Sequence, residues 1–160
     1  MTGIGVIRRE EKRWVVRLFL LVVVLSAMAL YIMTAHRTID WWFGSSYSMT
    51  AVTLGIHSPP GSLLLTLLGW AVAQIPLNIS PAFMLNIFAG LLGAVTCSLV
   101  LLLGLGLIRH RSVDDILSRT GSSAAALTGL VAGSLYLAFS ETIWRYSVIF
   151  MPYILTALFT

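Results

Sequence analysis

The 160-residue chain has few charged side chains, a single cysteine and none of the common catalytic or nucleotide-binding motifs. Charged residues make up 10% of it and hydrophobic residues 58%, whereas a soluble domain has about 25% charged residues. So few charges cannot cover a soluble globule of this size, and the composition predicts a helical integral membrane protein. The lone Cys97 excludes a disulfide or a cysteine metal cluster within the chain, and we interpret it as a small buried hydrophobe.

Positive charge is concentrated at the N-terminus. Half of the ten basic residues lie within the first seventeen positions, namely Arg8, Arg9, Lys12, Arg13 and Arg17. A basic cluster before an apolar run is typical of a juxtamembrane segment, so we expect no nucleic acid as a partner. The positive-inside rule predicts that residues 1–13 are a cytoplasmic tail. The uncharged run at residues 18–35 is longer than the core of a signal peptide and predicts a retained transmembrane helix.

Apolar runs predict three full spans and an incomplete fourth. The full spans are expected at residues 14–35, 82–108 and 123–140, and a further hydrophobic segment follows a break at Thr142–Trp144. That last segment, residues 147–160, is too short to complete a crossing, since a span needs roughly 20 residues. We therefore expect either that the sequence is truncated or that this segment docks on a partner. Residues 1–160 are predicted to form a single, incomplete transmembrane module.

The short apolar segment at residues 61–75 decides the topology. It has fewer than the roughly 20 residues of a span, and we predict that it enters the membrane without crossing. The loop at residues 109–122, which carries three arginines, is then cytoplasmic. The loop at residues 36–60, rich in Trp and Tyr, then lies on the outer side with an interfacial helix at residues 45–56. Residues 141–153 return to the same outer side.

Small residues recur at a spacing of four in two of the expected spans. One pair is Ala89 and Gly93, and the other is Gly129 and Gly133. Residues at this spacing share a helix face and let two helices approach closely. We interpret both pairs as intramolecular packing positions and not as dimerisation motifs.

Asp40 is the only carboxylate in the predicted outer loop. It lies between Arg37 and the aromatic pair Trp41–Trp42. One interpretation makes Asp40 a general base or a cation ligand near a sugar or phosphate. The other makes it an interfacial residue paired with Arg37. Under the first interpretation the only expected cofactor is a divalent cation, and the sequence does not assign a ligand set to it.

Two other groups of residues suggest phosphate or sugar binding. His57 and Ser58 precede a Pro-Pro-Gly bend, where a histidine can bind phosphate or carry a proton, and the alternative is a turn with an incidental histidine. A second polar and aromatic patch comprises Glu141, Trp144, Arg145 and Tyr153. The arginine of that patch can grip a phosphate bidentately, or it can snorkel from a helix end.

Four blocks of the sequence resemble a known family in their order and spacing. They read TLGIHSPPG at residues 53–61, AFMLN at 82–86, GLLGA at 90–94, and AFS at 138–140 with Trp144 and Tyr153 after it. They resemble a bacterial membrane family of unknown function that is similar to protein O-mannosyltransferases, within the GT-C glycosyltransferases. The resemblance covers residues 38–155.

The resemblance implies an all-α, polytopic GT-C-like N-terminal transmembrane module. Its first outer loop would carry interfacial or re-entrant helices and an acidic residue that serves as base or metal ligand. The loop would bind a polyprenyl-phosphate sugar at the outer leaflet of a bacterial inner membrane, with the N-terminus in the cytoplasm.

The sequence departs from that family at polar positions. The family usually has Trp-Asp-Ser-Gly-Glu where residues 42–46 read Trp-Phe-Gly-Ser-Ser, so both acids are absent. The family's histidine is displaced by one position, to His57, with Ser58 in its place, and Met151 stands where a glutamate is usual. Asp40 lies three residues before the missing aspartate and would share its helix face, so it is the best remaining base.

We therefore expect a glycosyltransferase-like membrane protein that transfers a sugar from a polyprenyl-phosphate donor to an acceptor at the outer face. Asp40 is the expected catalytic residue, and the expected substrate-binding residues are Trp42, His57, Ser58, Trp144, Arg145 and Tyr153. The alternative is a non-catalytic membrane scaffold or subunit derived from that family, with a membrane protein as its partner, because the loop acids are absent.

Overall fold

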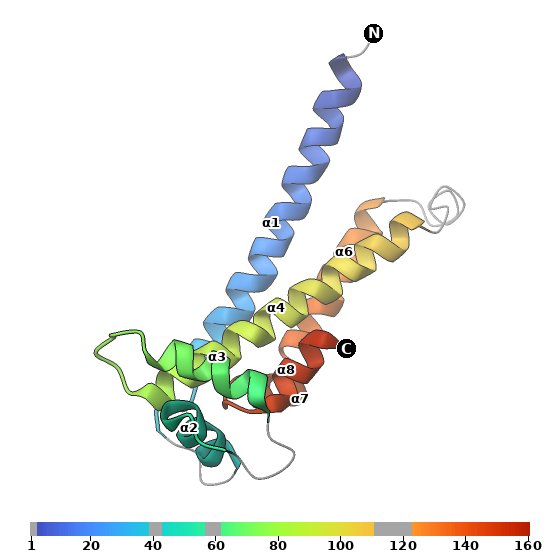
Figure 1. The fold of residues 1–160 in the computed structure, drawn as a ribbon. Coiled ribbons are helices and arrows are strands. Elements are labelled where there is room, and N and C mark those ends of the chain that lie inside the picture. Colours follow the sequence, from blue (N-terminus) through green and yellow to red (C-terminus); the bar gives the residue numbers. More distant parts are fainter. Residues whose placement is uncertain (1–2, 39–42, 57–61, 111–122) are drawn as a thin grey trace.

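The computed structural model is entirely helical in the part of the chain that it describes. It describes residues 3–38, 43–56, 62–110 and 123–160. Within these ranges it has seven α-helices and no strand: α1 (Gly3–Thr34), α2 (Phe43–Thr53), α3 (Leu63–Ala73), α4 (Pro81–His110), α6 (Ser123–Ala138), α7 (Glu141–Ser147) and α8 (Pro152–Phe159) (Figure 1). The expected all-α fold is confirmed.

Two helices are long and apolar enough to cross a membrane. They are Val16–Thr34, with 19 residues of α1, and Pro81–Leu107, with 27 residues of α4. At 1.5 Å per residue, the α1 segment rises about 28 Å, which matches the roughly 30 Å thickness of a bilayer's hydrocarbon core. The chain is thus an integral membrane protein whose helices contact lipid.

The expected third span is not one straight helix. α6 has 16 residues, and a bend of 58° separates Ala125–Ala138 from Glu141–Ser147. This pair is a third span only if both helices cross together. Of the three predicted spans, two are single helices in the described residues, and the third stays a prediction that depends on the bent pair crossing as one.

The position of the break also differs from the prediction. Thr142–Trp144 were expected to interrupt the apolar run, but they are helical residues of α7. The break lies at Phe139–Ser140, where the Ser140 hydroxyl accepts a hydrogen bond from the Ile143 N–H at 3.4 Å. Ser140 therefore acts as the N-cap of α7, and a new helix starts directly after residue 140, where the expected span ended.

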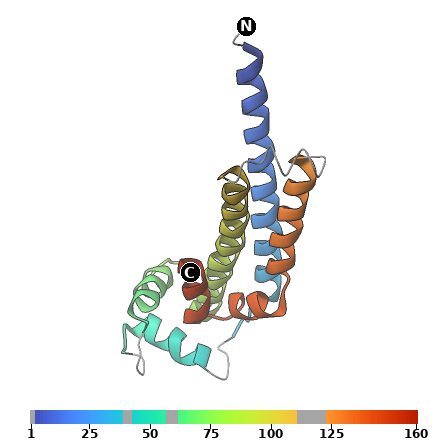
Figure 2. The same ribbon diagram turned by 90° about the vertical axis from the view of Figure 1, so that its right-hand side faces the viewer.

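The helices α2 and α3 lie at the end of the bundle where α1 ends and α4 begins (Figures 1 and 2). α2 corresponds to the interfacial helix expected at residues 45–56. α3 has 11 residues, which rise about 16 Å, too little to cross. The chain leaves α1 and enters α4 at the same end, as a non-crossing segment requires. Which side of the membrane is cytoplasmic stays a prediction.

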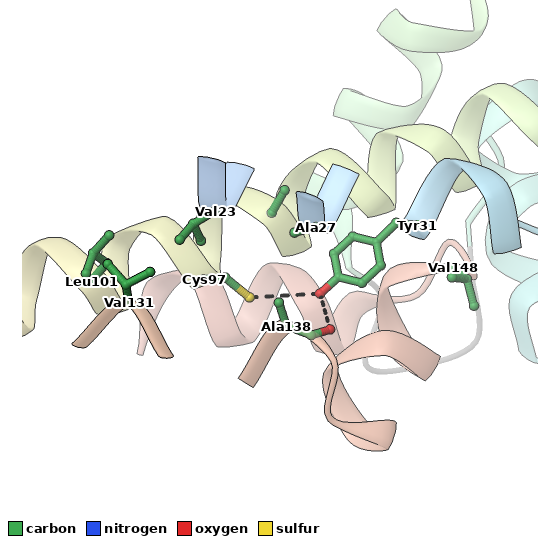
Figure 3. Close-up of a cluster of buried hydrophobic side chains, with 9 residues drawn as sticks. Val23, Ala27, Tyr31, Cys97, Leu101, Val131, Ala138 and Val148 are labelled. Carbon is green, nitrogen blue, oxygen red and sulfur yellow. Dashed lines mark hydrogen bonds between the residues drawn. The ribbon is translucent and has the colours of Figure 1, made fainter. Parts of the chain in front are cut away.

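Two buried clusters hold the helices together. The first lies between α1, α4 and α6 and includes Val23, Cys97 and Val131 (Figure 3). The second lies where α2, α3 and α8 pack on α4 and includes Leu65 and Phe150. This second cluster attaches the short helices firmly to one end of the bundle.

The two small-residue pairs behave differently. Ala89 is fully buried, and a Cβ on Gly93 would meet the side chains of Ser147 and Tyr31, so the predicted close packing of this pair is confirmed. A Cβ on Gly129 or Gly133 would meet nothing within 4 Å. The predicted intramolecular packing of that second pair is therefore wrong for the part of the chain that the structure describes.

Candidate functional site

A buried asparagine joins two distant segments at the end of the bundle where α1 stops. Asn86, near the start of α4, is 4% exposed. Its Nδ2 donates a hydrogen bond to the His36 carbonyl at 2.8 Å, and its Oδ1 accepts one from the Phe150 N–H at 2.9 Å. Asn86 thus holds the chain after α1 and the chain between α7 and α8 on one turn of α4.

The bent pair α6–α7 is attached to the last turns of α1. The Tyr31 hydroxyl donates a hydrogen bond at 2.9 Å to the carbonyl of Ala138, which the end of α6 leaves without an intrahelical partner. Cys97 Sγ lies 3.9 Å from the same hydroxyl (Figure 3). Trp144 Nε1 donates to Thr34 Oγ1 at 2.8 Å. These bonds hold α7 at the same end of the bundle as the segment that follows α1.

An open hollow of about 570 Å³ lies between α2 and the start of α4. Its described lining comes from three segments: Arg37 and Thr38 after α1, Ser48, Met49 and Val52 of α2, and Ser80, Pro81 and Ala82 at the start of α4. Arg37 alone among these side chains is charged, and it is exposed. The hollow therefore combines one cation with a largely apolar wall.

The helices α7 and α8 present a second surface at this end. Arg145 lies in the last turn of α7, where the helix dipole favours a cation, and it is exposed. Tyr153 is 57% exposed, and its ring centroid lies 4.9 Å from that of Tyr146 with a tilt of 49°. This surface offers an exposed guanidinium and a pair of rings that each combine an apolar face with a hydroxyl.

Three of the site residues predicted from the sequence lie in the described part of the chain. Trp144, Arg145 and Tyr153 lie on α7 and α8, and Arg145 and Tyr153 are accessible. Trp144 is half-buried and its indole N–H is bonded to Thr34, which gives this side chain a structural role. Asp40, Trp42, His57 and Ser58 lie outside the described residues.

Sequence reasoning missed three polar side chains that shape this region. Asn86 and Tyr31 each make long-range hydrogen bonds there, and Tyr146 forms the ring pair with Tyr153. The sequence did carry a signal for Asn86, because a polar amide within an apolar, membrane-spanning run is usually buried against a partner. Nothing in the sequence indicated that Tyr146 and Tyr153 would meet.

The described residues offer no clear metal site. Nowhere in residues 3–38, 43–56, 62–110 or 123–160 do three or more His, Cys, Asp or Glu side chains gather closely enough to hold a metal ion. Asp40, the one cation ligand suggested by the sequence, lies outside these ranges. No step is therefore assigned to a metal.

A family of known proteins matches most of the chain, including the short helices at this end of the bundle. A family model described as "Protein O-mannosyl-transferase TMEM260 N-terminal domain" matches residues 44–160. The match begins in α2 and extends through α8, so it contains Arg145 and Tyr153 but not α1 or Asp40. No curated protein and no solved structure matches the chain.

Proposed function

Because the chain belongs to the family of the TMEM260 N-terminal domain, described as a protein O-mannosyl-transferase domain, we propose that it takes part in sugar transfer at a membrane surface. In this proposal it transfers a sugar, mannose by the family description, from a polyprenyl-phosphate donor. The acceptor is a hydroxyl group at the outer face. The architecture proposed for this chemistry is that of the GT-C glycosyltransferases.

The family match over residues 44–160 is the observation that carries the proposal. The arrangement of the described residues supports it, since Arg37 and Arg145 are both exposed at the end of the bundle where α1 stops and α4 begins. A phosphate-linked sugar needs cations for its phosphate and polar or aromatic groups for its sugar ring. That end of the molecule supplies both kinds of group.

The proposed reaction needs a base and a cationic contact for the leaving group. The acceptor oxygen bonds to the anomeric carbon of the sugar, the bond from that carbon to the phosphate oxygen breaks, and the polyprenyl phosphate leaves. Asp40 accepts the proton of the acceptor hydroxyl. His57 and Arg145 contact the phosphate as its charge increases, and Ser58 donates a hydrogen bond to the substrate.

Aromatic side chains take the sugar in this proposal. Trp42 and Tyr153 pack against its apolar ring face, with Tyr146 supporting the ring of Tyr153. Trp144 contributes mainly by holding α7 against the end of α1, because its indole N–H is bonded to Thr34.

A transfer assay tests the proposal. The full chain in lipid nanodiscs would receive polyprenyl-phosphate mannose with a tritiated sugar, together with serine- and threonine-containing peptides. We expect label to appear in peptide, and Asp40→Asn to lower the rate about 10²- to 10⁴-fold, the usual contribution of a general base. Asp114→Asn, the same change in the predicted cytoplasmic loop, is the matched control and should keep the wild-type rate.

A non-catalytic role is the second candidate, and one observation favours it. Met151 is 9% exposed and lies at the N-cap of α8. The family that the sequence resembles usually has a glutamate at this position. A buried thioether cannot act as an acid or base. If the wild-type chain transfers no sugar to peptide but purifies with a membrane protein partner, the scaffold role replaces the enzymatic one.

A further inference from the structure

We propose that the hollow between α2 and the start of α4 binds the phosphate end of the polyprenyl-phosphate donor, and that Arg37 contacts this phosphate in addition to His57 and Arg145. The identity of the lipid rests on the proposed function. The site itself rests on the described residues alone.

The hollow lies where two membrane-spanning helices leave the hydrocarbon core. The apolar part of α1 ends at Thr34, three residues before Arg37, and the apolar part of α4 begins at Pro81. Both Arg37 and Pro81 line the hollow. Lipid phosphates lie just outside the hydrocarbon core, so a lipid beside these helices has its phosphate at the level of Arg37.

The backbone beside the hollow is fixed, while the Arg37 side chain is exposed. Ser80 Oγ donates a hydrogen bond to the Arg37 carbonyl at 3.3 Å, and Asn86 Nδ2 donates one to the preceding carbonyl, that of His36, at 2.8 Å. These bonds attach the segment to α4 through its main chain. The guanidinium is thus positioned at the hollow, and its planar set of N–H donors fits a phosphate bidentately.

The rest of the described lining of the hollow suits a hydrocarbon chain. Met49 and Val52 of α2 are 62% and 40% exposed, and Pro81 and Ala82 continue the apolar lining on α4. None of the described lining residues is acidic, so nothing among them opposes an anion. A cation beside an apolar wall selects an amphiphile with an anionic head over free phosphate or a neutral lipid.

Equilibrium binding of tritiated polyprenyl phosphate to the full chain in phosphatidylcholine nanodiscs tests this site. We expect Arg37→Gln to weaken binding tenfold or more. Arg17→Gln removes the same charge from an exposed arginine in α1, seventeen residues before its C-terminal residue Thr34, and should bind as the wild type does. Unphosphorylated polyprenol should bind weakly to the wild type, and Arg37→Gln should not change its affinity.

A second pair of variants tests the apolar wall without changing charge. Val52→Trp would fill the hollow and should weaken binding of polyprenyl phosphate, whereas Val95→Trp is the control on α4. The two valines have similar exposure, 40% and 37%, but only Val52 lines the hollow. Size-exclusion chromatography of each variant shows whether it remains folded.

The possible results separate this site from the proposed function. If Arg37→Gln and Val52→Trp both bind polyprenyl phosphate like the wild type, the site is overturned, whether or not sugar transfer is observed. Equal competition by phosphatidylglycerol or by inorganic phosphate would also overturn it, because the site would then not be selective for the donor lipid. Arg37-dependent binding without any sugar transfer would support the site and count against the enzymatic function.

Discussion

Asn86 and Phe150, 64 residues apart in the sequence, are joined by a hydrogen bond of 2.9 Å from the Phe150 N–H to the side-chain oxygen of Asn86. The amide nitrogen of the same side chain donates to His36. One residue of a membrane-spanning helix thereby positions the segment that contains Arg37 and the connection between α7 and α8. The hollow beside Arg37 and the surface formed by α7 and α8 therefore both depend on Asn86.

Replacing Asn86 should therefore destabilise the protein strongly. Asn86→Ala leaves the His36 carbonyl and the Phe150 N–H without their partner, and an unpaired buried group costs about 1–3 kcal/mol. We expect the free energy of unfolding to fall by about 2–4 kcal/mol, measured by denaturant titration in detergent. Asn78→Ala changes an exposed asparagine between α3 and α4 and should have little effect. Equal stability of the two variants would show that the paired hydrogen bonds of Asn86 are unimportant.

The bend between α6 and α7 should depend on the Tyr31 hydroxyl. Tyr31→Phe removes the donor to the Ala138 carbonyl and keeps the ring. Interhelical hydrogen bonds in membranes contribute about 0.6 kcal/mol on average and up to about 1.7, so we expect a loss of about 1 kcal/mol in the same unfolding measurement. Tyr136→Phe, at a residue 81% exposed, is the control. A loss of similar size in both variants would argue against a specific role for Tyr31.

Two glycines should respond oppositely to a methyl group. A Cβ on Gly93 would meet Ser147 and Tyr31, and we expect Gly93→Ala to cost about 1–3 kcal/mol through overpacking. A Cβ on Gly133 would meet nothing within 4 Å, so Gly133→Ala should be neutral or stabilise α6 by up to about 1 kcal/mol. Thermal unfolding of both variants in one detergent gives the comparison. Clear destabilisation by Gly133→Ala would indicate that this face of α6 has a partner.

The two long spans and the short helix α3 could be predicted from the sequence because they depend on local composition. The uncharged run that ends at Ala35 predicted α1, and the few apolar residues before Pro76 predicted a helix too short to cross. Length and hydrophobicity alone decide such features, because a bilayer has a fixed thickness.

Features that depend on tertiary contacts could not be predicted. The bond between Tyr31 and Ala138 joins residues 107 positions apart, and no local pattern indicates such a pair. The end of the span near residue 140 was predicted, but the helix that follows it was not, because Thr142–Trp144 interrupt the apolar run and the capping serine before Glu141 was overlooked. The hollow beside Arg37 forms only when α2 and α4 meet, so it too was missed.

Measuring which side of the membrane each end of the bundle faces is the most direct test. Both proposed sites require the end that carries α2 and α7 to face the outer side. Ser46→Cys in α2 and Glu141→Cys in α7 would be labelled with a membrane-impermeant maleimide in intact cells, in parallel with Ser112→Cys in the loop between α4 and α6. Native Cys97 is buried and should not react. We expect labelling of the first two positions from outside, and of Ser112→Cys only after the membrane is permeabilised. Labelling of Ser112→Cys in intact cells, or opposite results for Ser46→Cys and Glu141→Cys, would contradict this orientation.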